Sequence, residues 1–358
     1  MRLTQETDLI VYGAGYCGAM LVELLQKSGI RPLCVFDRDR SKQGRQVFGV
    51  EIVEPRCQRA DIVIVALLVK GTVYASIKAH LLKLGYSEKQ VVHIYDLENQ
   101  RNLFDKQKLV IWPDVSVVEK EADRFAWLEG VLSDQESKQV LSAAKCFLAG
   151  DADTVFPTHP IREQYFAYDI YKRTEEEKVI DCGGFQGDVM RIFLENNEGQ
   201  FSHYTIIEPD ASYNRFIETN TDGFCRDKIN ILNCALSDQS GEVYVTNYMD
   251  MNSTVSEYET AYSTRKVRAA ALDTLVDAAC TFLKIDIEGY EMKMLRGAKR
   301  IITSQKPLVA VAAYHHECDV PDIAQTLLTY NPKYRLYLRS YMNYQEMILY
   351  AVPEDRLR

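Results

Sequence analysis

The sequence predicts an α/β protein with two domains, each built on a mostly parallel sheet flanked by helices. Two segments carry this prediction, residues 8–37 and 179–208. Each contains a strand, a glycine turn, a helix, a second strand and an acidic residue in that order. In both segments a run of aliphatic residues precedes the glycines and an apolar periodic stretch follows them. The length of 358 residues is sufficient for two such domains.

The first segment predicts a Rossmann-like domain over residues 1–112. Gly13, Gly15 and Gly18 have the spacing of a dinucleotide-binding turn, and Asp37 ends the next strand, where an acid can accept hydrogen bonds from a ribose. The helix that begins here offers unpaired N–H groups to a phosphate. We therefore expect a nucleotide or nucleotide sugar, and a domain kept for packing or dimerisation is the alternative. The expected strands are Asp8–Tyr12, Leu33–Phe36, Val50–Val53, Asp61–Leu68 and Val91–Tyr95, and the expected helices are Tyr16–Ser28 and Val73–Leu84.

Residues 113–174 are predicted to form a helical connector. Apolar residues recur at i, i+3 and i+4 over Glu119–Val131 and Asp134–Leu148, which is typical of helices with one buried face. Asp, Thr and Pro interrupt this pattern over Gly150–Pro160. The second domain is expected to follow over residues 175–358.

The second glycine turn lies in the stretch VIDCGGFQGD, residues 179–188. Asp181 ends the strand, and Gly183 and Gly187 let the backbone approach a ligand closely. Glu208 ends the next strand and can accept hydrogen bonds from ribose hydroxyls. The glycine spacing is wider than in dinucleotide-binding turns, which suits S-adenosylmethionine because this cofactor has no pyrophosphate. We therefore expect these four residues to bind S-adenosylmethionine.

The rest of the second domain continues the alternation of strands and helices. A helix is expected over Met292–Thr303, after a sharp exit that Gly289 allows. Two segments rich in β-formers, Tyr334–Leu338 and Glu346–Ala351, are expected to pair with each other at the end of the chain. The remaining expected strands are Val179–Asp181, Tyr204–Glu208, Ile229–Asn233, Phe282–Asp286 and Leu308–Ala313.

Residues 165–353 resemble the FkbM family of S-adenosylmethionine-dependent methyltransferases. The matching segments are VIDCGGFQGD, IIEPD, INILNCALSDQSGEVYV and ALDTLVDAACTFLKIDIEGYEMKMLRGAKRII, of which KIDIEGYE and LRGA are the most specific. The resemblance implies a class I methyltransferase fold, a doubly wound sheet of seven strands with an antiparallel terminal strand. It also implies that an aromatic segment containing Tyr165 lies over the cofactor. The alternative is a core aromatic pair that docks the connector.

Methyl transfer to a hydroxyl needs a group that accepts the hydroxyl proton, commonly worth about 10²–10⁴-fold in rate. Asp286 and Glu288 follow one strand and His315 ends the next, so all three are expected at the carboxyl edge of the sheet. Lys284, Asp286 and Glu288 alternate, which predicts that they lie on one side of the strand. We expect Asp286 to meet the acceptor or the cofactor, Glu288 to support it or act as a base, and His315 to be a further candidate base.

Other interpretations of these residues stay open. Lys284, Asp286 and Glu288 can pair among themselves as a structural network, and His315 can be an exposed residue at the start of a loop. Asp286, Glu288 and His315 can also form a divalent-metal site with two carboxylates and one histidine, although no local ligand spacing enforces it.

The composition, with 47% hydrophobic and 26% charged residues, is that of a soluble globular protein. The net charge is −9, yet residues 1–112 carry +4, so the rest carries −13. This acidic part has no basic stripe, which argues against nucleic acid as a partner. The longest apolar run, Ile62–Val69, is too short to cross a membrane. The nine cysteines include no C-x-x-C pair, and no export signal precedes them, so we expect reduced thiols and a cytoplasmic protein.

The leading interpretation is an S-adenosylmethionine-dependent O-methyltransferase that acts on a sugar hydroxyl of a glycan, nucleotide sugar or glycosylated metabolite. The family resemblance supplies the reaction. The sugar preference comes from the family's habits and from the first domain, which resembles the nucleotide-sugar-binding domains of bacterial sugar-modifying transferases. The alternatives are an NAD-dependent oxidoreductase built on the first domain and a non-catalytic nucleotide-binding protein that serves assembly. Against the oxidoreductase, the second domain has a cofactor turn of its own.

Overall fold

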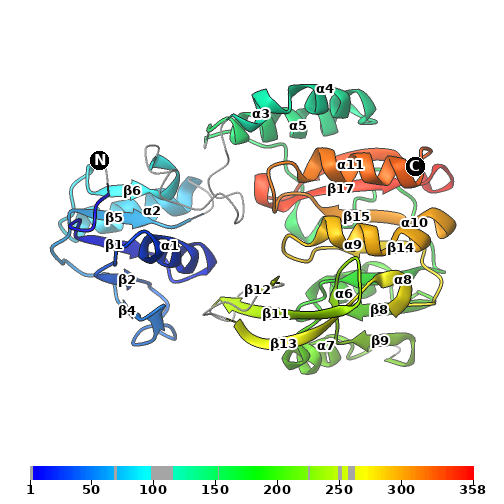
Figure 1. The fold of residues 1–358 in the computed structure, drawn as a ribbon, viewed down its shortest axis with the longest axis horizontal. Coiled ribbons are helices and arrows are strands. Elements are labelled where there is room, and N and C mark those ends of the chain that lie inside the picture. Colours follow the sequence, from blue (N-terminus) through cyan, green and yellow to red (C-terminus); the bar gives the residue numbers. More distant parts are fainter. Residues whose placement is uncertain are drawn as a thin grey trace. The chain divides into compact units, whose positions relative to one another are not determined.

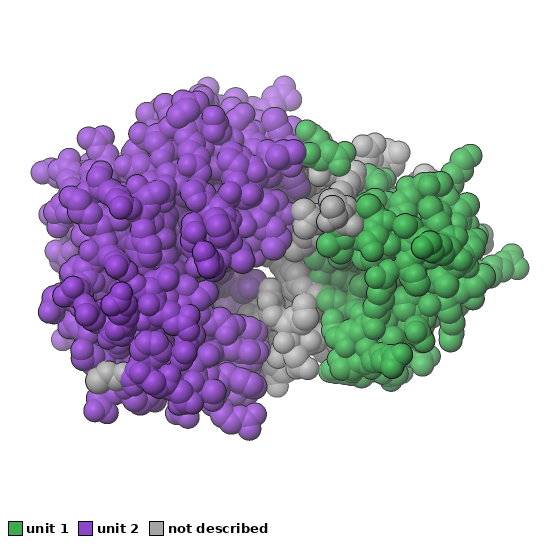
Figure 2. All heavy atoms as spheres, turned by 180° about the vertical axis from the view of Figure 1, so that it is seen from behind, with its two compact units in different colours: residues 1–114, 151–153, 247–252 green, residues 115–150, 154–246, 253–358 purple. Residues whose placement is uncertain are grey.

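The computed structural model describes residues 3–67, 71–97, 116–151, 153–224, 226–248, 252–256 and 263–358. The chain divides into two compact units, which Figure 2 colours separately. The first unit contains residues 1–114, 151–153 and 247–252, and the second contains residues 115–150, 154–246 and 253–358. Leu68, the expected end of a strand, and the expected boundary at residue 112 lie outside the described residues.

The first unit is built on a six-stranded sheet with the strand order β3-β4-β2-β1-β5-β6 (Figure 1). All paired strands in it run parallel except β3 and β4. This order, with β1 near the centre, is Rossmann-like, as predicted. The last expected strand is shorter than predicted, because Ile94–Asp96 form a 3₁₀ turn. The elements are β1 Leu9–Tyr12, α1 Tyr16–Lys27, β2 Cys34–Phe36, β3 Gln46–Val47, β4 Val50–Val53, β5 Ile62–Val65, α2 Gly71–Lys83 and β6 Val91–His93.

Gly18 allows α1 to pack directly on the turn that precedes it. A Cβ atom at Gly18 would lie 1.7 Å from the carbonyl oxygen of Gly13, so a larger residue would push the helix off the turn. Gly29 follows the end of α1 with φ +76°, the left-handed conformation of a helix C-cap. A side chain is therefore excluded at Gly18 by close packing and disfavoured at Gly29 by its backbone conformation.

The second unit contains a seven-stranded sheet with the order β16-β17-β15-β14-β7-β8-β9 (Figure 1). β17 runs antiparallel to both of its neighbours, and the other pairs are parallel. The predicted class I methyltransferase sheet with its antiparallel terminal strand is thereby confirmed. The elements are β7 Lys178–Cys182, α6 Asp188–Asn196, β8 His203–Ile207, α7 Asn214–Asn220, β9 Ile229–Leu232, β14 Phe282–Ile285, β15 Leu308–Ala312, α11 Asp319–Tyr330, β16 Arg335–Ser340 and β17 Met347–Val352.

The central strands of this sheet are covered on both faces. β15 has the sequence LVAVA, and all five of its residues are fully buried, as expected of a parallel strand between two helical layers. Each fully buried Leu or Val side chain contributes roughly 1.5–3 kcal/mol through removal of apolar surface from water. Charged residues inside such a sheet are therefore exceptions, and two of them, Asp181 and Lys284, lie in the neighbouring strands β7 and β14.

The expectation of one helix over Met292–Thr303 is wrong. The segment forms two helices, α9 Glu291–Gly297 and α10 Lys299–Gln305, which meet at Ala298. Gly297 lets α9 approach the chain after β10, since a Cβ atom there would lie 2.1 Å from the carbonyl oxygen of Ser237. The sequence also did not predict a separate four-stranded sheet, ordered β10-β13-β11-β12. Its strands are β10 Ala235–Leu236, β11 Gly241–Tyr248, β12 Asn252–Ser256 and β13 Ser263–Ala270, and a short helix, α8 Leu272–Leu275, follows them.

The two connector helices form, although the first begins at Ala122 rather than at Glu119, and the second packs on the edge strand β16. They are α4 Ala122–Val131 and α5 Gln135–Leu148, preceded by the short α3 Val117–Lys120. Asp134 caps α5 by accepting a 2.8 Å hydrogen bond from the N–H of Ser137. Arg339 of β16 is buried against the same cap, with Nη2 2.6 Å from Asp134 Oδ2. Among the described residues, no helix is long and apolar enough to cross a membrane.

Candidate active site

Two adjacent glycines shape the turn between β7 and α6. Gly183 has φ +83°, and a Cβ atom there would lie 1.7 Å from the carbonyl oxygen of Asp286. A Cβ atom at Gly184 would lie 2.1 Å from the side chain of Ile206. Gly187, with φ +87°, is the N-cap of α6 and provides no side-chain hydrogen bond to the first turn. The turn therefore packs on the carboxyl end of β14 and leaves N–H groups of α6 available to a ligand.

Glu208 follows β8 and connects that strand to the glycine turn. Its two carboxylate oxygens accept hydrogen bonds from the N–H groups of Phe185 and Asp210, each at 2.9 Å. Burial raises the pKa of Glu208 to about 7, although these two donors act in the opposite direction. The carboxylate is fixed beside the turn, where an acid binds a ribose in doubly wound folds.

Asp181 lies inside the sheet and forms an ion pair there. Its Oδ1 lies 3.0 Å from Nζ of Lys284, its register partner on β14, and its Oδ2 accepts a 2.8 Å hydrogen bond from Tyr204. Lys284 also donates to the carbonyl oxygen of Gly183 at 2.6 Å. Burial would lower the pKa of Lys284, but Asp181 raises it above its ordinary value. The pair thus supports the turn from within the sheet, and a direct contact of Asp181 with the cofactor stays a prediction.

Tyr165 is also buried and contacts Asp286. Its side chain is 2% exposed, and its hydroxyl donates a 2.5 Å hydrogen bond to Oδ2 of Asp286. The Tyr165 backbone is left-handed, with φ +68°, and the ammonium of Lys284 lies 5.2 Å from the centre of its ring. Burial raises the pKa of Tyr165 well above its ordinary value, so the phenol stays a donor. The structure brings Tyr165 to the candidate catalytic group, and its predicted contact with the cofactor stays a prediction.

Asp286, Glu288 and His315 come together at the carboxyl ends of β14 and β15. Nε2 of His315 lies 3.7 Å from Oδ1 of Asp286 and 3.6 Å from Oε2 of Glu288. The predicted alternation along one strand is wrong, because β14 ends at Ile285 and Glu288 has a left-handed φ of +57°. The alternative of an exposed His315 is also wrong, because its side chain is only 2% exposed.

Glu291, which the sequence analysis does not single out, contacts the other nitrogen of His315. Its Oε1 lies 3.0 Å from Nδ1 of His315 and accepts hydrogen bonds from the N–H groups of Ile287 and Gly289. Burial would lower the pKa of His315, but the carboxylates of Glu291, Glu288 and Asp286 raise it well above the ordinary value. Burial would raise the pKa of Glu291, but His315 lowers it. The imidazole is thus fixed by a buried carboxylate.

Two further acids near this group were also missed. Oδ2 of Asp319 accepts a 2.6 Å hydrogen bond from the N–H of His316, and Oε2 of Glu346 accepts one from Gln164 at 2.6 Å. Burial raises the pKa of Glu288, Asp319 and Glu346 to about 7 in each case. Asp319 begins α11 next to its apolar face, and an acid in that place is the signal that could have identified it.

In the first unit, Asp37 contacts the predicted nucleotide turn. Its Oδ2 accepts a 2.7 Å hydrogen bond from the N–H of Ala14, and its Oδ1 accepts one of 2.8 Å from Asp39. Gly15 is the N-cap of α1 and provides no side-chain hydrogen bond. The residues predicted to hold a nucleotide are therefore close together, and nucleotide binding stays a prediction.

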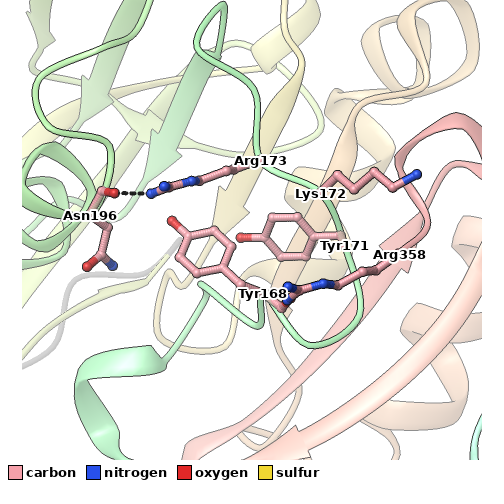
Figure 3. Close-up of a pocket in the computed structure, with 6 residues that line it drawn as sticks. All are labelled: Tyr168, Tyr171, Lys172, Arg173, Asn196 and Arg358. Carbon is pink, nitrogen blue, oxygen red and sulfur yellow. Dashed lines mark hydrogen bonds between the residues drawn. The ribbon is translucent and has the colours of Figure 1, made fainter.

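A pocket of about 570 Å³ is lined by residues of the segment before β7, by Asn196 at the end of α6 and by Arg358 (Figure 3). The guanidinium groups of Arg173 and Arg358 donate to the backbone carbonyls of Asn196 and Tyr168. None of the residues that line it belongs to the predicted site. The lining residues are Tyr168, Tyr171, Lys172, Arg173, Asn196 and Arg358.

Comparison with known structures supports the fold of the whole chain. The crystal structure of the methyltransferase FkbM from Methylobacillus flagellatus KT aligns with a TM-score of 0.70 at 21% identity, over 97% of this chain and 90% of that one. An rRNA methylase from Streptococcus thermophilus aligns at 11% identity over 57% of this chain and all of that one, with a TM-score of 0.35. The N-methyltransferase NodS from Bradyrhizobium japonicum WM9 aligns at 9% identity over 66% of this chain and 97% of that one, with a TM-score of 0.29. The last two scores are too low to support an inference.

The sequence comparisons identify the catalytic domain. No curated protein matches the chain significantly. Residues 181–344 match the family model described as the Methyltransferase FkbM domain. The matched range contains the glycine turn, Glu208 and the group of Asp286, Glu288 and His315. The chain therefore contains an FkbM methyltransferase domain over residues 181–344 and is an S-adenosylmethionine-dependent methyltransferase.

Proposed function

We propose that the protein methylates a sugar hydroxyl in a glycan, a nucleotide sugar or a glycosylated metabolite. The supporting observation is the group of Asp286, Glu288 and His315 at the carboxyl ends of two central strands. A hydroxyl is a weak nucleophile until a nearby base removes its proton, and two carboxylates are available here. Carboxylates are also good hydrogen-bond acceptors for the several hydroxyls of a sugar.

The cofactor is proposed to bind at the Gly183–Gly187 turn with its ribose on Glu208. Each carboxylate oxygen of Glu208 accepts one backbone hydrogen bond and keeps a second lone pair for a ribose hydroxyl. The N–H groups at the start of α6 suit the carboxylate of the cofactor's amino-acid part. Because Gly183 packs on the carbonyl of Asp286, a cofactor at this turn would carry its methyl group toward the proposed catalytic residues.

In the proposed reaction the acceptor oxygen attacks the methyl carbon in line with the sulfur. The C–O bond forms while the C–S bond breaks, and the electron pair of that bond stays on sulfur. The hydroxyl proton passes to Glu288, which has the most exposed side chain of the three, 26% against 20% for Asp286 and 2% for His315. Asp286, held by Tyr165, binds the acceptor hydroxyl.

A panel of acceptors tests this proposal. Purified protein and S-adenosylmethionine are incubated with nucleotide sugars and oligosaccharides, and the release of S-adenosylhomocysteine is measured. Each active sugar is compared with analogues that lack one hydroxyl. We expect turnover with at least one sugar and its loss with a single deoxy analogue. Turnover with amines or carboxylic acids alone would contradict the proposal.

For the first unit we propose an anionic nucleotide at the Gly13, Gly15 and Gly18 turn, with its ribose toward Asp37. The support is the uncapped start of α1 and the charge of +4 over residues 1–112. Gly15 has φ −90° and ψ −169°, which any residue can adopt, so Gly15→Val should keep the fold. Calorimetry should show loss of nucleotide-sugar or NAD binding with S-adenosylmethionine affinity unchanged. If the wild-type chain binds no nucleotide at millimolar concentration, the proposal fails and the first unit is a structural module.

A further inference from the structure

We propose that Asp286, Glu288 and His315 bind a divalent metal ion through Oδ1, Oε2 and Nε2. These three atoms lie within 4.8 Å of one another. The catalytic role of such an ion rests on the proposed function, whereas its binding does not.

The three atoms face one another at distances that leave room for an ion. Nε2 of His315 is 3.7 Å from Oδ1 of Asp286 and 3.6 Å from Oε2 of Glu288, which is too long for hydrogen bonds. Oδ1 of Asp286 is buried and has no hydrogen-bond partner among the described residues. A buried acceptor without a partner is costly, and a cation between the three atoms would satisfy it.

Glu291 forms an ion pair with His315 through Nδ1, so Nε2 is the nitrogen of the ring that a metal ion can bind. Its Oε1 lies 3.0 Å from Nδ1 of His315 and is itself held by the N–H groups of Ile287 and Gly289. The other nitrogen, Nε2, faces Asp286 and Glu288, and a metal ion bound there would take the place of a proton. Carboxylate–histidine–metal arrangements of this kind are common around protein metal sites.

A second group of one glutamate, one histidine and one aspartate differs from the proposed metal site in its charge balance. Glu136, His159 and Asp169 also lie close together, but a buried guanidinium lies among them. Arg339 is 2.9 Å from Asp169 and 3.8 Å from Glu136, and Glu136 is 2.6 Å from His159. The negative charge of this second group is therefore already balanced by an arginine.

Among the described residues, no arginine lies between the three ligands of the proposed metal site. The buried cation beside it, Lys284, pairs with Asp181 instead. Glu291, a further buried carboxylate, adds negative charge beside His315. A divalent ion would balance this surplus.

Two carboxylate oxygens and one imidazole leave coordination positions open for water and for the acceptor hydroxyl. This ligand set suits Mn²⁺ and Mg²⁺, and also Fe²⁺ or Zn²⁺. A hydroxyl bound to such an ion loses its proton more readily. The proton would pass to the oxygen of Glu288 that does not bind the ion, and the resulting alkoxide would attack the methyl carbon.

Metal titrations of the full-length protein test the inference. Chelator-treated protein is titrated with Mn²⁺ and followed by electron paramagnetic resonance, and calorimetry repeats the titration with Mg²⁺ and Zn²⁺. We expect one saturable site per chain. Glu291→Gln should weaken it about 10–100-fold, and His315→Ala, which removes a ligand, should weaken it more. His159→Ala, in the arginine-balanced group, should leave it unchanged. Circular dichroism checks that each variant is folded.

Two results would overturn the inference. One is the absence of saturable binding of all three ions at millimolar concentration, and the other is wild-type binding by folded His315→Ala. If metal-free protein transfers methyl groups at the full rate, the metal ion has no catalytic role, and the proposed O-methylation of a sugar is not contradicted. Specific Mn²⁺ binding without methylation of any sugar would support the site and count against the proposed function.

Discussion

The hydroxyl of Tyr165 donates a 2.5 Å hydrogen bond to Oδ2 of Asp286, although 121 positions separate the two residues in the sequence. The contact connects the segment before β7 to the carboxyl end of β14. Tyr165 has a left-handed backbone and is almost completely buried, so the surrounding core holds it in this position. We infer that Tyr165 positions Asp286 for the reaction.

Tyr165→Phe should lower kcat and leave the affinity for S-adenosylmethionine unchanged. The substitution keeps the ring but removes the donor, and a hydrogen bond to a charged group contributes about 1.5–3 kcal/mol, or roughly 10–100-fold in rate. Steady-state kinetics and calorimetry on the same preparation measure the two effects. A weaker cofactor affinity at unchanged kcat would instead indicate that Tyr165 contacts the cofactor directly.

Glu208→Gln should weaken S-adenosylmethionine binding by roughly 10–100-fold, because the amide replaces one charged acceptor for the ribose hydroxyls by a donor. Calorimetry measures the dissociation constant. Glu218→Gln is the matched control, since Glu218 is exposed on α7 and pairs only loosely with Arg226. Equal affinities of Glu208→Gln and wild type would remove Glu208 from the cofactor site.

Gly183→Ala should destabilise the protein far more than Gly223→Ala. Both glycines have positive φ, +83° and +87°, so both substitutions carry the left-handed backbone cost of about 1–2 kcal/mol. The added Cβ atom meets the carbonyl of Asp286 at 1.7 Å in the first case and nothing within 4 Å in the second. Urea unfolding compares the two variants. Equal losses in the free energy of unfolding would show that the close approach of the turn to β14 is absent.

The stability of the protein should fall at acid pH partly through Asp134. Burial would raise the pKa of this carboxyl, but hydrogen bonds from Arg339 and Ser137 bring it below its ordinary value. A carboxylate with a lowered folded-state pKa stabilises the fold above its unfolded-state pKa, and this contribution disappears as the pH falls through the folded-state value. Asp134→Asn should therefore lower the Tm at pH 7, and its difference from wild type should shrink below about pH 4.

Thermal melts between pH 7 and pH 3 test this expectation. Asp123→Asn, at an exposed position of α4, serves as the control and should differ little from wild type at any pH. A difference between Asp134→Asn and wild type that stays constant over the whole range would count against the ion pair with Arg339.

The doubly wound fold of the two larger sheets could be predicted from the sequence because it depends on local signals. The glycine turns and the aliphatic strands can be read directly, and a parallel sheet brings the strand ends to one edge. That principle predicted the meeting of Asp286 and His315. It could not predict the bend at Glu288, because a left-handed residue depends on the contacts around it.

The missed residues share one physical origin. Glu291 reaches His315 from α9, and Glu346 comes from the turn before β17, so both positions depend on how separate elements pack. The pairing of Asp181 with Lys284 depends on the register of β7 against β14, which a single sequence does not specify. The sequence thus predicted which strand ends share an edge of the sheet, whereas the contacts made by side chains from helices and turns required the structure.

The most direct test of the account is the chemical position of the transferred methyl group. Protein is incubated with S-adenosylmethionine labelled with ¹³C in its methyl group and with the best sugar acceptor, and the product is examined by nuclear magnetic resonance and mass spectrometry. The account predicts a single labelled methyl ether on one sugar oxygen, formed in equal amount to S-adenosylhomocysteine. A label on nitrogen or carbon, or no transfer to any hydroxyl-bearing sugar while another class of acceptor is methylated, would contradict it.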